Sequence, residues 1–388
     1  MSAFQELDYY AIDSLYTEEE RMARDTVRNL VDKEIIPTIG KHFDEGTFPH
    51  ELVPKFGELG LLGPSLTGYG CSGMSPTAYG LICQELERGD SGIRSFCSVQ
   101  GSLCMYPIWA YGSEEQKNKY LPGMAAGKII GCFGLTEPDH GSDPGGMLTK
   151  AVKTDKGYVL NGTKRWISNG TIAHIAIVWA KLDGKVRGFI VPTDSKGFTA
   201  QDIKGKWSLR ASVTSELIME DCEISDDALL PEVSGLRGPL GCLTQARFGI
   251  AFGAVGAMQA CYDEALRYVR DRPQFGKPLA SFQLVQQKLA YMVTEITKAQ
   301  LLNLQLGRLK EAGNLRPQHV SLAKRNNCYE AREIARMARD MLGANGVTVD
   351  YHCGRHMLNI ESIYTYEGTH DIHTLVIGND VTGISAFA

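Results

Sequence analysis

The chain has 388 residues, a length typical of two or three domains that share a large core. Apolar residues make up 43% of it and charged residues 22%, which excludes disordered, fibrous and membrane-embedded classes. The 40 Lys and Arg against 45 Asp and Glu give a net charge of −5, so we expect no nucleic-acid partner.

The first third of the chain, residues 1–130, is predicted to form an N-terminal helical domain. Thr17 and Glu20 make a capping box before an apolar stripe, and Pro37 is expected to end that helix. The uncharged stretch 95–113 approaches the length of a membrane span, but it contains Ser, Gln, Gly and Pro, which indicates buried protein interior. We therefore expect no membrane association.

The N-terminal sequence and the cysteines bear on the compartment. The first twenty residues are acidic and lack both the apolar core of a signal peptide and the Arg-rich character of a transit peptide. The ten cysteines are scattered without a CxxC pair, which predicts reduced, mostly buried thiols. We expect a cytoplasmic protein, or a mitochondrial matrix protein if the chain is a processed eukaryotic one.

Residues 131–236 change in character and predict a middle, mostly antiparallel β domain. Asn161-Gly162 and Asp183-Gly184 are both predicted to be tight turns. Over residues 237–388 the helical pattern returns, with apolar residues three and four apart between Phe282 and Ala299. The predicted fold class is α+β, with the C-terminal domain a four-helix bundle.

Two patterns suggest sites that their context disfavours. Gly68, Gly70 and Gly73 have the GxGxxG spacing of a dinucleotide-binding loop, but no second strand follows, so a surface loop is favoured. Two pairs of histidines could each share a helical face, yet no HExxH motif or CxxC pair accompanies them, so we predict no metal site. The pairs are His352 with His356, beside Cys353, and His370 with His373.

Five separated segments carry the strongest signal. The first, CFGLTEPDHGSD at 132–143, is by composition a turn-rich loop whose backbone and hydroxyl groups suit a planar heterocycle or a phosphate. The others are RWISN at 165–169, RDRPQFGKPL at 270–279, LGANG at 342–346 and YEGTHDIH at 366–373. Together they resemble the acyl-CoA dehydrogenase family over nearly the whole chain. The resemblance implies two helical domains flanking a β domain, FAD bound across a subunit boundary, a homotetramer, and electron-transfer flavoprotein as electron acceptor.

By this resemblance Glu367 is the catalytic base, which removes the α-proton of an acyl thioester while a β-hydride passes to flavin N5. Such chemistry needs a carboxylate in a dry cleft, where burial raises its proton affinity. Thr369 can cap the helix that follows. Taken alone, an acid in this position more often complements a helix dipole.

The resemblance also implies two groups of FAD-binding residues. One lies on two loops of the β domain: Phe133, Leu135, Thr136, Ser142, Trp166, Ile167 and Ser168. The other includes Arg272, Phe275 and Gln283 from a neighbouring subunit, where Arg272 can donate to pyrophosphate oxygens. Backbone contacts to FAD are expected from the segment 340–344, which includes Asp340, Gly343 and Ala344. Thr369 is the last implied FAD-binding residue.

The segment LERGDSGIRSFCSVQ at 86–100 resembles the substrate pocket of the glutaryl-CoA dehydrogenases within that family. A buried, unpaired guanidinium is costly unless the substrate ends in a carboxylate, so Arg94 implies a dicarboxylic acyl chain. The alternative is that Arg94 only pairs with Glu87, seven residues earlier on the same helical face. Ile93 and Trp207 depart from the tyrosine and phenylalanine expected at these positions. The implied substrate-binding residues are Glu87, Arg94, Ser95, Ser142, Arg247, Tyr366 and Gly368.

The implied function is the FAD-dependent oxidative decarboxylation of glutaryl-CoA to crotonyl-CoA and CO2, a step in lysine and tryptophan degradation. Glu87 and Tyr366 are expected to compete for Arg94 and so release the terminal carboxylate. One alternative is a short-chain acyl-CoA oxidase or dehydrogenase that does not decarboxylate. Another is a catalytically silent flavin-binding protein, against which the intact Glu367, Arg94 and Glu87 argue.

Overall fold

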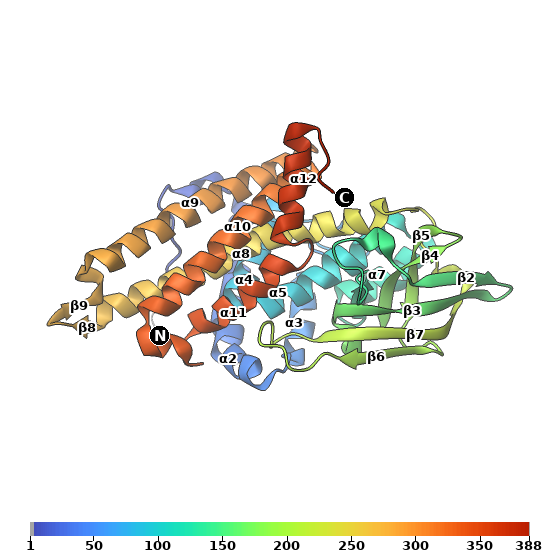
Figure 1. Ribbon diagram of the computed structural model, residues 1–388, viewed down its shortest axis with the longest axis horizontal. Coiled ribbons are helices and arrows are strands. Elements are labelled where there is room, and N and C mark those ends of the chain that lie inside the picture. Colours follow the sequence, from blue (N-terminus) through green and yellow to red (C-terminus); the bar gives the residue numbers. More distant parts are fainter. Residues whose placement is uncertain (1–3, 388) are drawn as a thin grey trace.

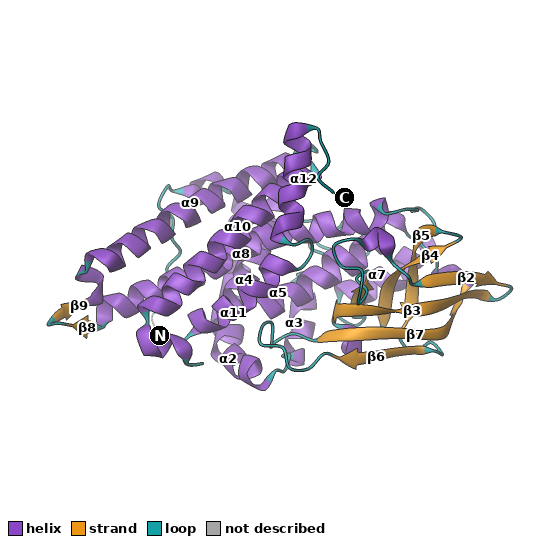
Figure 2. Cartoon of the chain, viewed as in Figure 1, coloured by secondary structure: helices purple, strands orange, loops and turns teal. Residues whose placement is uncertain are grey.

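Helices fill one end of the molecule and a β-sheet forms the other (Figure 1). The structure, a computed structural model, describes residues 4–387. Helices from the beginning and the end of the chain pack together, whereas the sheet comes from the middle third (Figure 2). This arrangement confirms the predicted α+β fold class with a middle β domain.

The N-terminal helices begin with the predicted capping box. Oε2 of Glu20 accepts from the N–H of Thr17 at 2.8 Å, and Oγ1 of Thr17 accepts from the N–H of Glu20 at 3.3 Å. The prediction that Pro37 ends this helix is wrong. A π-helical segment, Val31–Ile35, continues α1 into α2, and Pro37 lies in the first turn of α2, where its missing N–H is tolerated. The helices are α1 (Glu18–Leu30), α2 (Ile36–Glu45), α3 (Val53–Glu58), α4 (Pro76–Gly89), α5 (Ser91–Ser98), α6 (Tyr106–Tyr111) and α7 (Glu114–Ala125).

The sheet has seven strands in the order β1-β4-β2-β3-β7-β6, with β5 paired to β4. β1 and β2 run parallel to β4, and the other pairs are antiparallel. The turn predicted at Asp183-Gly184 is confirmed, but the one at Asn161-Gly162 is wrong: both residues lie inside β3 at a bulge, where Gly162 has φ +149°. The chain turns instead at Asp155-Lys156. The strands are β1 (Gly131–Gly134), β2 (Lys150–Thr154), β3 (Gly157–Ser168), β4 (Ile175–Leu182), β5 (Lys185–Pro192), β6 (Phe198–Asp202) and β7 (Thr214–Ser225).

The C-terminal helices form a bundle around a core of small and apolar side chains, among them Ala254, Met292 and Ala335. α8 also packs against α4, and a Cβ on Gly256 would lie 1.8 Å from the carbonyl oxygen of Gln84. Glycine on α8 therefore lets the N-terminal and C-terminal helices approach closely. The elements are α8 (Arg237–Asp271), the short strands β8 (Pro273–Gln274) and β9 (Lys277–Pro278), α9 (Gln283–Glu311), α10 (Pro317–Met341), α11 (His352–Thr365) and α12 (His370–Thr382).

A single extended residue, Asp90, separates α4 from α5. Its carboxylate accepts from the N–H of Gly92 at 2.6 Å and so caps α5. The same carboxylate binds Asn359 of α11 at 2.9 Å and forms an ion pair with Arg355. This buried junction ties the segment at 86–100 to the C-terminal helices.

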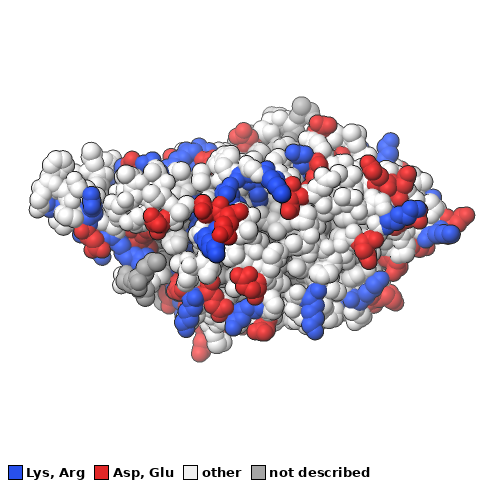
Figure 3. All heavy atoms as spheres, turned by 90° about the horizontal axis from the view of Figure 1, so that it is seen from below, with Lys and Arg blue, Asp and Glu red and all other residues white. Residues whose placement is uncertain are grey.

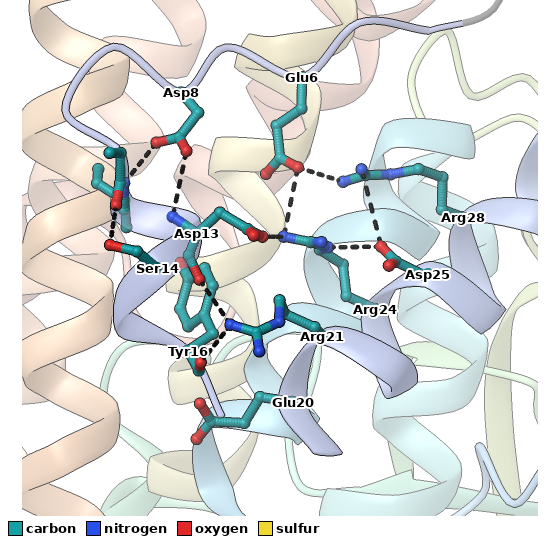
Figure 4. A network of polar contacts seen from close by, with 12 residues as sticks. Glu6, Asp8, Asp13, Ser14, Tyr16, Glu20, Arg21, Arg24, Asp25 and Arg28 are labelled. Carbon is teal, nitrogen blue, oxygen red and sulfur yellow. Dashed lines mark hydrogen bonds and ion pairs between the residues drawn. The ribbon is translucent and has the colours of Figure 1, made fainter. Parts of the chain in front are cut away.

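The segment before α1 is fastened by ion pairs (Figure 4). Arg28 pairs with Glu6 at 2.8 Å and with the buried Glu85 of α4 at 2.6 Å. Arg24 pairs with Asp13 at 2.5 Å. The network gives residues 6–13 a fixed place against α1 and α4.

Charges are mixed on the face of the molecule shown in Figure 3, where basic and acidic side chains lie side by side. Within residues 4–387 no helix is long and apolar enough to cross a membrane. The ten cysteines are free thiols, and all but Cys71 are buried, as predicted.

Candidate active site

Glu367 lies in a strained turn between α11 and α12. Its φ of +52° is in the left-handed region, which residues other than glycine rarely adopt, and Gly368 follows with φ +89°. A Cβ on Gly368 would lie 2.9 Å from Nε2 of His373 and 3.2 Å from Nη2 of Arg247. Thr369 caps α12 as predicted, since its Oγ1 accepts an N–H of the first turn at 3.1 Å. Such strain persists only where the surroundings impose it, and it is frequent in active sites.

The carboxylate of Glu367 is available for proton transfer. Its Oε2 atom is buried and has no hydrogen-bond partner among the described residues. Burial raises the pKa of Glu367 above its ordinary value, and the positive charges of Arg94, Lys324 and Arg247 oppose part of that rise. A buried, unpaired carboxylate with a raised pKa is well suited to take a proton from carbon.

Arg94 lies fully buried beside this turn. On α5, its Nε donates to Oε2 of Glu87 at 2.5 Å, and its Nη2 donates to the hydroxyl of Tyr366. The predicted pairing exists, but the partners do not share a helical face, because α4 ends before Asp90 and Arg94 belongs to the next helix. Nη1 of Arg94 and Oε1 of Glu87 remain buried without a partner in the part of the chain that the structure describes. The free Nη1 suits an anionic ligand oxygen as acceptor.

Two glycines of α8 leave space for Glu87 and Tyr79, two polar side chains of α4. A Cβ on Gly253 would lie 2.6 Å from Oε2 of Glu87, and one on Gly249 would lie 2.7 Å from the hydroxyl oxygen of Tyr79. A larger residue at either position would have to displace the polar side chain opposite. The polar pocket therefore depends on small residues of the facing helix.

The loop after β1 lies against the end of β3. The prediction of a second loop at Trp166, Ile167 and Ser168 is wrong, because these residues belong to that strand. The N–H of Arg165 donates to the carbonyl oxygen of Thr136 at 2.9 Å. Glu137 fastens the loop after β1, because its carboxylate accepts from two backbone N–H groups, at 148 and 149, and from Nζ of the buried Lys164 at 2.9 Å. Trp166, at φ +63°, stays 57% exposed beside it. An exposed aromatic ring next to a loop with hydroxyl groups suits a planar ligand.

Several predicted cofactor-binding residues have buried side chains. Phe133 and Leu135 pack in the core shared with the N-terminal helices, and Ile167 packs in the core of the sheet. A ligand can reach little of these three residues, because they are only 3–8% exposed. Ser142, by contrast, lies exposed in the loop between β1 and β2.

The second predicted group lies far from the first. Arg272 and Phe275, on the hairpin of β8 and β9, and Gln283, which begins α9, are exposed, Phe275 by 92%. An ion pair between Lys288 and Asp340 fastens the segment 340–344, with Gly343 and Ala344, to α9. Figure 1 shows the hairpin at the opposite end of the molecule from the sheet. One chain does not bring the two groups together.

Sequence analysis missed Lys324, whose Nζ donates to the carbonyl oxygens of Tyr366 and Gly368 at 2.8 and 2.7 Å. A weak signal was present: Val320 and Cys328, four residues away on either side, mark that face of α10 as buried. Glu137 was missed as well, and nothing in a turn-rich loop distinguishes an acid that fastens it.

The structure shows where the glycine pattern and the histidines lie. Gly68, Gly70 and Gly73 lie in a loop between α3 and α4, two helices, so the strand required for dinucleotide binding is missing at that point. Among the described residues no three His, Cys, Asp or Glu side chains are arranged to hold a metal ion. Nδ1 of His373 is 3.0 Å from the hydroxyl oxygen of Ser321, and burial, with Lys324 and Arg247 nearby, lowers the pKa of His373 to about 2.

Models of three acyl-CoA dehydrogenase domains match the chain in succession: the N-terminal domain over residues 17–128, the middle domain over 132–222 and the C-terminal domain over 234–382. The chain belongs to the acyl-CoA dehydrogenase family. The predicted family membership is confirmed, and the protein is an enzyme of this family.

Three proteins illustrate the similarity. A glutaryl-CoA dehydrogenase from Mycobacterium smegmatis is 56% identical with a TM-score of 0.96, over 97% of this chain and 98% of that one. A glutaryl-CoA dehydrogenase from the same organism in complex with FADH2 is 51% identical with a TM-score of 0.97, over 98% and 99%. A probable acyl-CoA dehydrogenase of Bacillus subtilis (strain 168) is 36% identical over 376 residues, 94% of this chain and 98% of that protein.

Proposed function

We propose that this acyl-CoA dehydrogenase oxidises glutaryl-CoA and releases crotonyl-CoA and CO2. The observation that carries the substrate assignment is the fully buried guanidinium of Arg94, whose Nη1 has no partner among the described residues. Glu87 balances the charge of Arg94, but Nη1 still needs an acceptor, and an acyl chain ending in methyl offers none. A terminal carboxylate supplies it. The similarity to two glutaryl-CoA dehydrogenases supports the same substrate.

FAD is the cofactor, and the residues of this chain fit it. The exposed ring of Trp166 beside the hydroxyl of Thr136 suits a flavin ring, and a Cβ on Gly343 would meet nothing within 4 Å, which leaves the backbone open to a ligand. Arg272 makes no ion pair within residues 4–387, so its guanidinium is free for a pyrophosphate. The similar enzyme that holds FADH2 supports the assignment. When bound, FAD supplies the two-electron acceptor for the oxidation.

A second copy of the chain completes the cofactor site in this proposal. Arg272, Phe275 and Gln283 lie at the opposite end of the molecule from the β domain, so another subunit must supply them. Phe275, which is 92% exposed on the hairpin of β8 and β9, supports the burial of that hairpin against a second copy. A homotetramer, and electron-transfer flavoprotein as the electron acceptor, belong to the same proposal.

Glu367 acts first as a base. Its unpaired Oε2 accepts the α-proton of the thioester, and burial strengthens the basicity of the carboxylate. The positive charges of Arg94, Lys324 and Arg247 keep it ionised until then. Because its Oε2 atom is buried, the carboxylate needs little solvent reorganisation at that atom when it takes the proton.

Decarboxylation follows oxidation. The bond between the γ-carbon and the terminal carboxylate breaks, CO2 leaves, and the electron pair passes through the new double bond into a dienolate that the thioester carbonyl stabilises. Glu87 and Tyr366 already share the guanidinium of Arg94, so the departing carboxylate is not held by it alone. Glu367, now protonated, returns its proton to the γ-carbon.

The test is anaerobic addition of glutaryl-CoA, labelled with ¹³C in its terminal carboxylate, to the FAD-loaded enzyme. We expect the flavin absorbance to bleach in one turnover and mass spectrometry to find crotonyl-CoA and labelled CO2. Label retained in glutaconyl-CoA would refute decarboxylation but not dehydrogenation. Bleaching by butyryl-CoA but not by glutaryl-CoA would refute the substrate. Rapid hydrogen peroxide formation in air, without electron-transfer flavoprotein, would favour a short-chain oxidase.

A further inference from the structure

We infer that Lys324 is a positioning residue, which holds Glu367 in its reactive conformation and keeps a positive charge beside it. The inference rests on the proposed function in one respect, the role of Glu367 as the base. Lys324 is on α10, 43 positions before Glu367 in the sequence, and only the fold brings the two together.

The geometry of Lys324 is that of a clamp on the turn. Its Nζ donates to the carbonyl oxygen before Glu367, that of Tyr366, at 2.8 Å and to the one after it, that of Gly368, at 2.7 Å. Nε of Arg247 donates to the carbonyl oxygen of Glu367 itself at 2.7 Å. Three consecutive carbonyl groups thus accept from two cationic side chains.

This clamp acts where the backbone is strained. Glu367 and Gly368 both have positive φ values, and a glutamate leaves the left-handed region unless its neighbours fix the peptide groups on both sides. Lys324 fixes the peptide group before Glu367 and the one after Gly368, and Arg247 fixes the peptide group between Glu367 and Gly368. The direction of the Glu367 side chain therefore depends on a residue that does not touch it by a hydrogen bond.

Packing alone does not explain a lysine here. Lys324 is 1% exposed, and among the described residues no carboxylate oxygen lies within 4 Å of its Nζ. Burial lowers the pKa of Lys324 to about 8. An uncharged side chain of similar length would fill the space without that cost, so the charge and the donors are the features to be tested.

The other titratable and charged groups around Glu367 come from every helix packed against the turn. They are Glu87 of α4, Arg94 of α5, Arg247 of α8, Cys328 of α10, and His370 and His373 of α12, with Tyr366 in the turn itself. Lys324 differs from the cations Arg94 and Arg247 in donating on both sides of Glu367.

The experiment compares Lys324→Met, which removes the charge and the donors, with Lys324→Gln, which removes the charge and retains a donor. Lys310→Met is the matched control, because Lys310 also has a pKa lowered to about 8 by burial but donates to Gln245, away from the turn. The first readout needs no substrate: the pH titration of the Glu367 carboxyl band in infrared difference spectra of the FAD-loaded enzyme. Glu367→Gln identifies the band.

We expect the titration midpoint of Glu367 to rise by about 1 pH unit in both Lys324 variants and to stay unchanged in Lys310→Met. With glutaryl-CoA, the limiting rate of flavin bleaching should fall about 10-fold or more in Lys324→Met and less in Lys324→Gln, while the substrate concentration for half-maximal rate changes less than about threefold.

An unchanged midpoint in a folded Lys324 variant, or an equal shift in Lys310→Met, would overturn the inference. If Lys324→Met does not fold, Lys324→Gln decides by the same midpoint. Failure of the wild-type enzyme to bleach with glutaryl-CoA would count against the proposed function alone, because the infrared titration is independent of substrate.

Discussion

Replacement of Arg94 by leucine tests the recognition of a terminal carboxylate, provided that the partner of Arg94 is treated with it. Glu87 is fully buried, so Arg94→Leu alone leaves an uncompensated charge, which destabilises a fold by about 3–5 kcal/mol. Arg94→Leu should therefore be made together with Glu87→Gln. In this double variant, the loss of activity that remains reports the lost contact between the protein and the substrate carboxylate.

The size of that loss follows from the burial of the guanidinium. Removal of one partner of a buried, hydrogen-bonded charge pair costs about 2–5 kcal/mol, and about 3 kcal/mol corresponds to a loss of roughly 100-fold. We expect kcat/KM for glutaryl-CoA to fall by about that factor in the double variant, and kcat/KM for butyryl-CoA to change less than about threefold. Steady-state assays with excess electron acceptor measure both values. Equal losses for the two substrates would refute carboxylate recognition and leave Arg94 a structural role.

Three further predictions concern single residues. Glu367→Gln should retain FAD and slow anaerobic bleaching at least about 100-fold, because the amide cannot accept the proton; stopped-flow absorbance measures this rate. Gly253→Ala places a Cβ 2.6 Å from Oε2 of Glu87 and should destabilise the fold by about 1–3 kcal/mol, seen as a lower Tm. Burial raises the pKa of Glu137, but the N–H at Leu148, the hydroxyl of Thr149 and Lys164 lower it to about 2 overall, below the ordinary 4.5. Its ionised form therefore stabilises the fold above about pH 4.5, and this contribution is lost as the pH falls toward 2. Glu137→Gln should flatten the decline of the free energy of unfolding between pH 5 and 3 in urea titrations.

Each of these has a result that would contradict it. Undiminished bleaching in Glu367→Gln would remove Glu367 from the role of base. An unchanged Tm in Gly253→Ala would mean that Glu87 can move without loss. A decline of the unfolding free energy as steep in Glu137→Gln as in the wild type would show that other carboxyl groups govern acid stability.

The sequence by itself determined the fold class and, through the family resemblance, named candidates for the main groups of the site. The change from helical to strand periodicity near residue 131, and the return near 237, are local properties, so they can be recognised without the tertiary structure. Glu367, Arg94 and Glu87 stand in segments whose order along the chain is distinctive, and their residue types fit an acid–base step and a carboxylate ligand. Two local predictions failed. Pro37 lies in the first turn of α2, which a π-helical segment joins to α1, and Asn161-Gly162 lies at a bulge inside β3.

Only the tertiary structure decided which groups surround Glu367 and how they are arranged. Lys324 reaches the turn from another helix, and its hydrogen bonds go to backbone oxygens, which no side-chain pattern encodes. Glu87 and Arg94 are paired across a helix break at Asp90 rather than along one face, and this leaves one nitrogen of Arg94 unpaired. Burial raises the pKa of Glu367 and makes an unpaired charge unfavourable. It is a property of packing between segments distant in sequence. A linear pattern can name the residue types of a site, but the contacts that tune them form only when those segments meet.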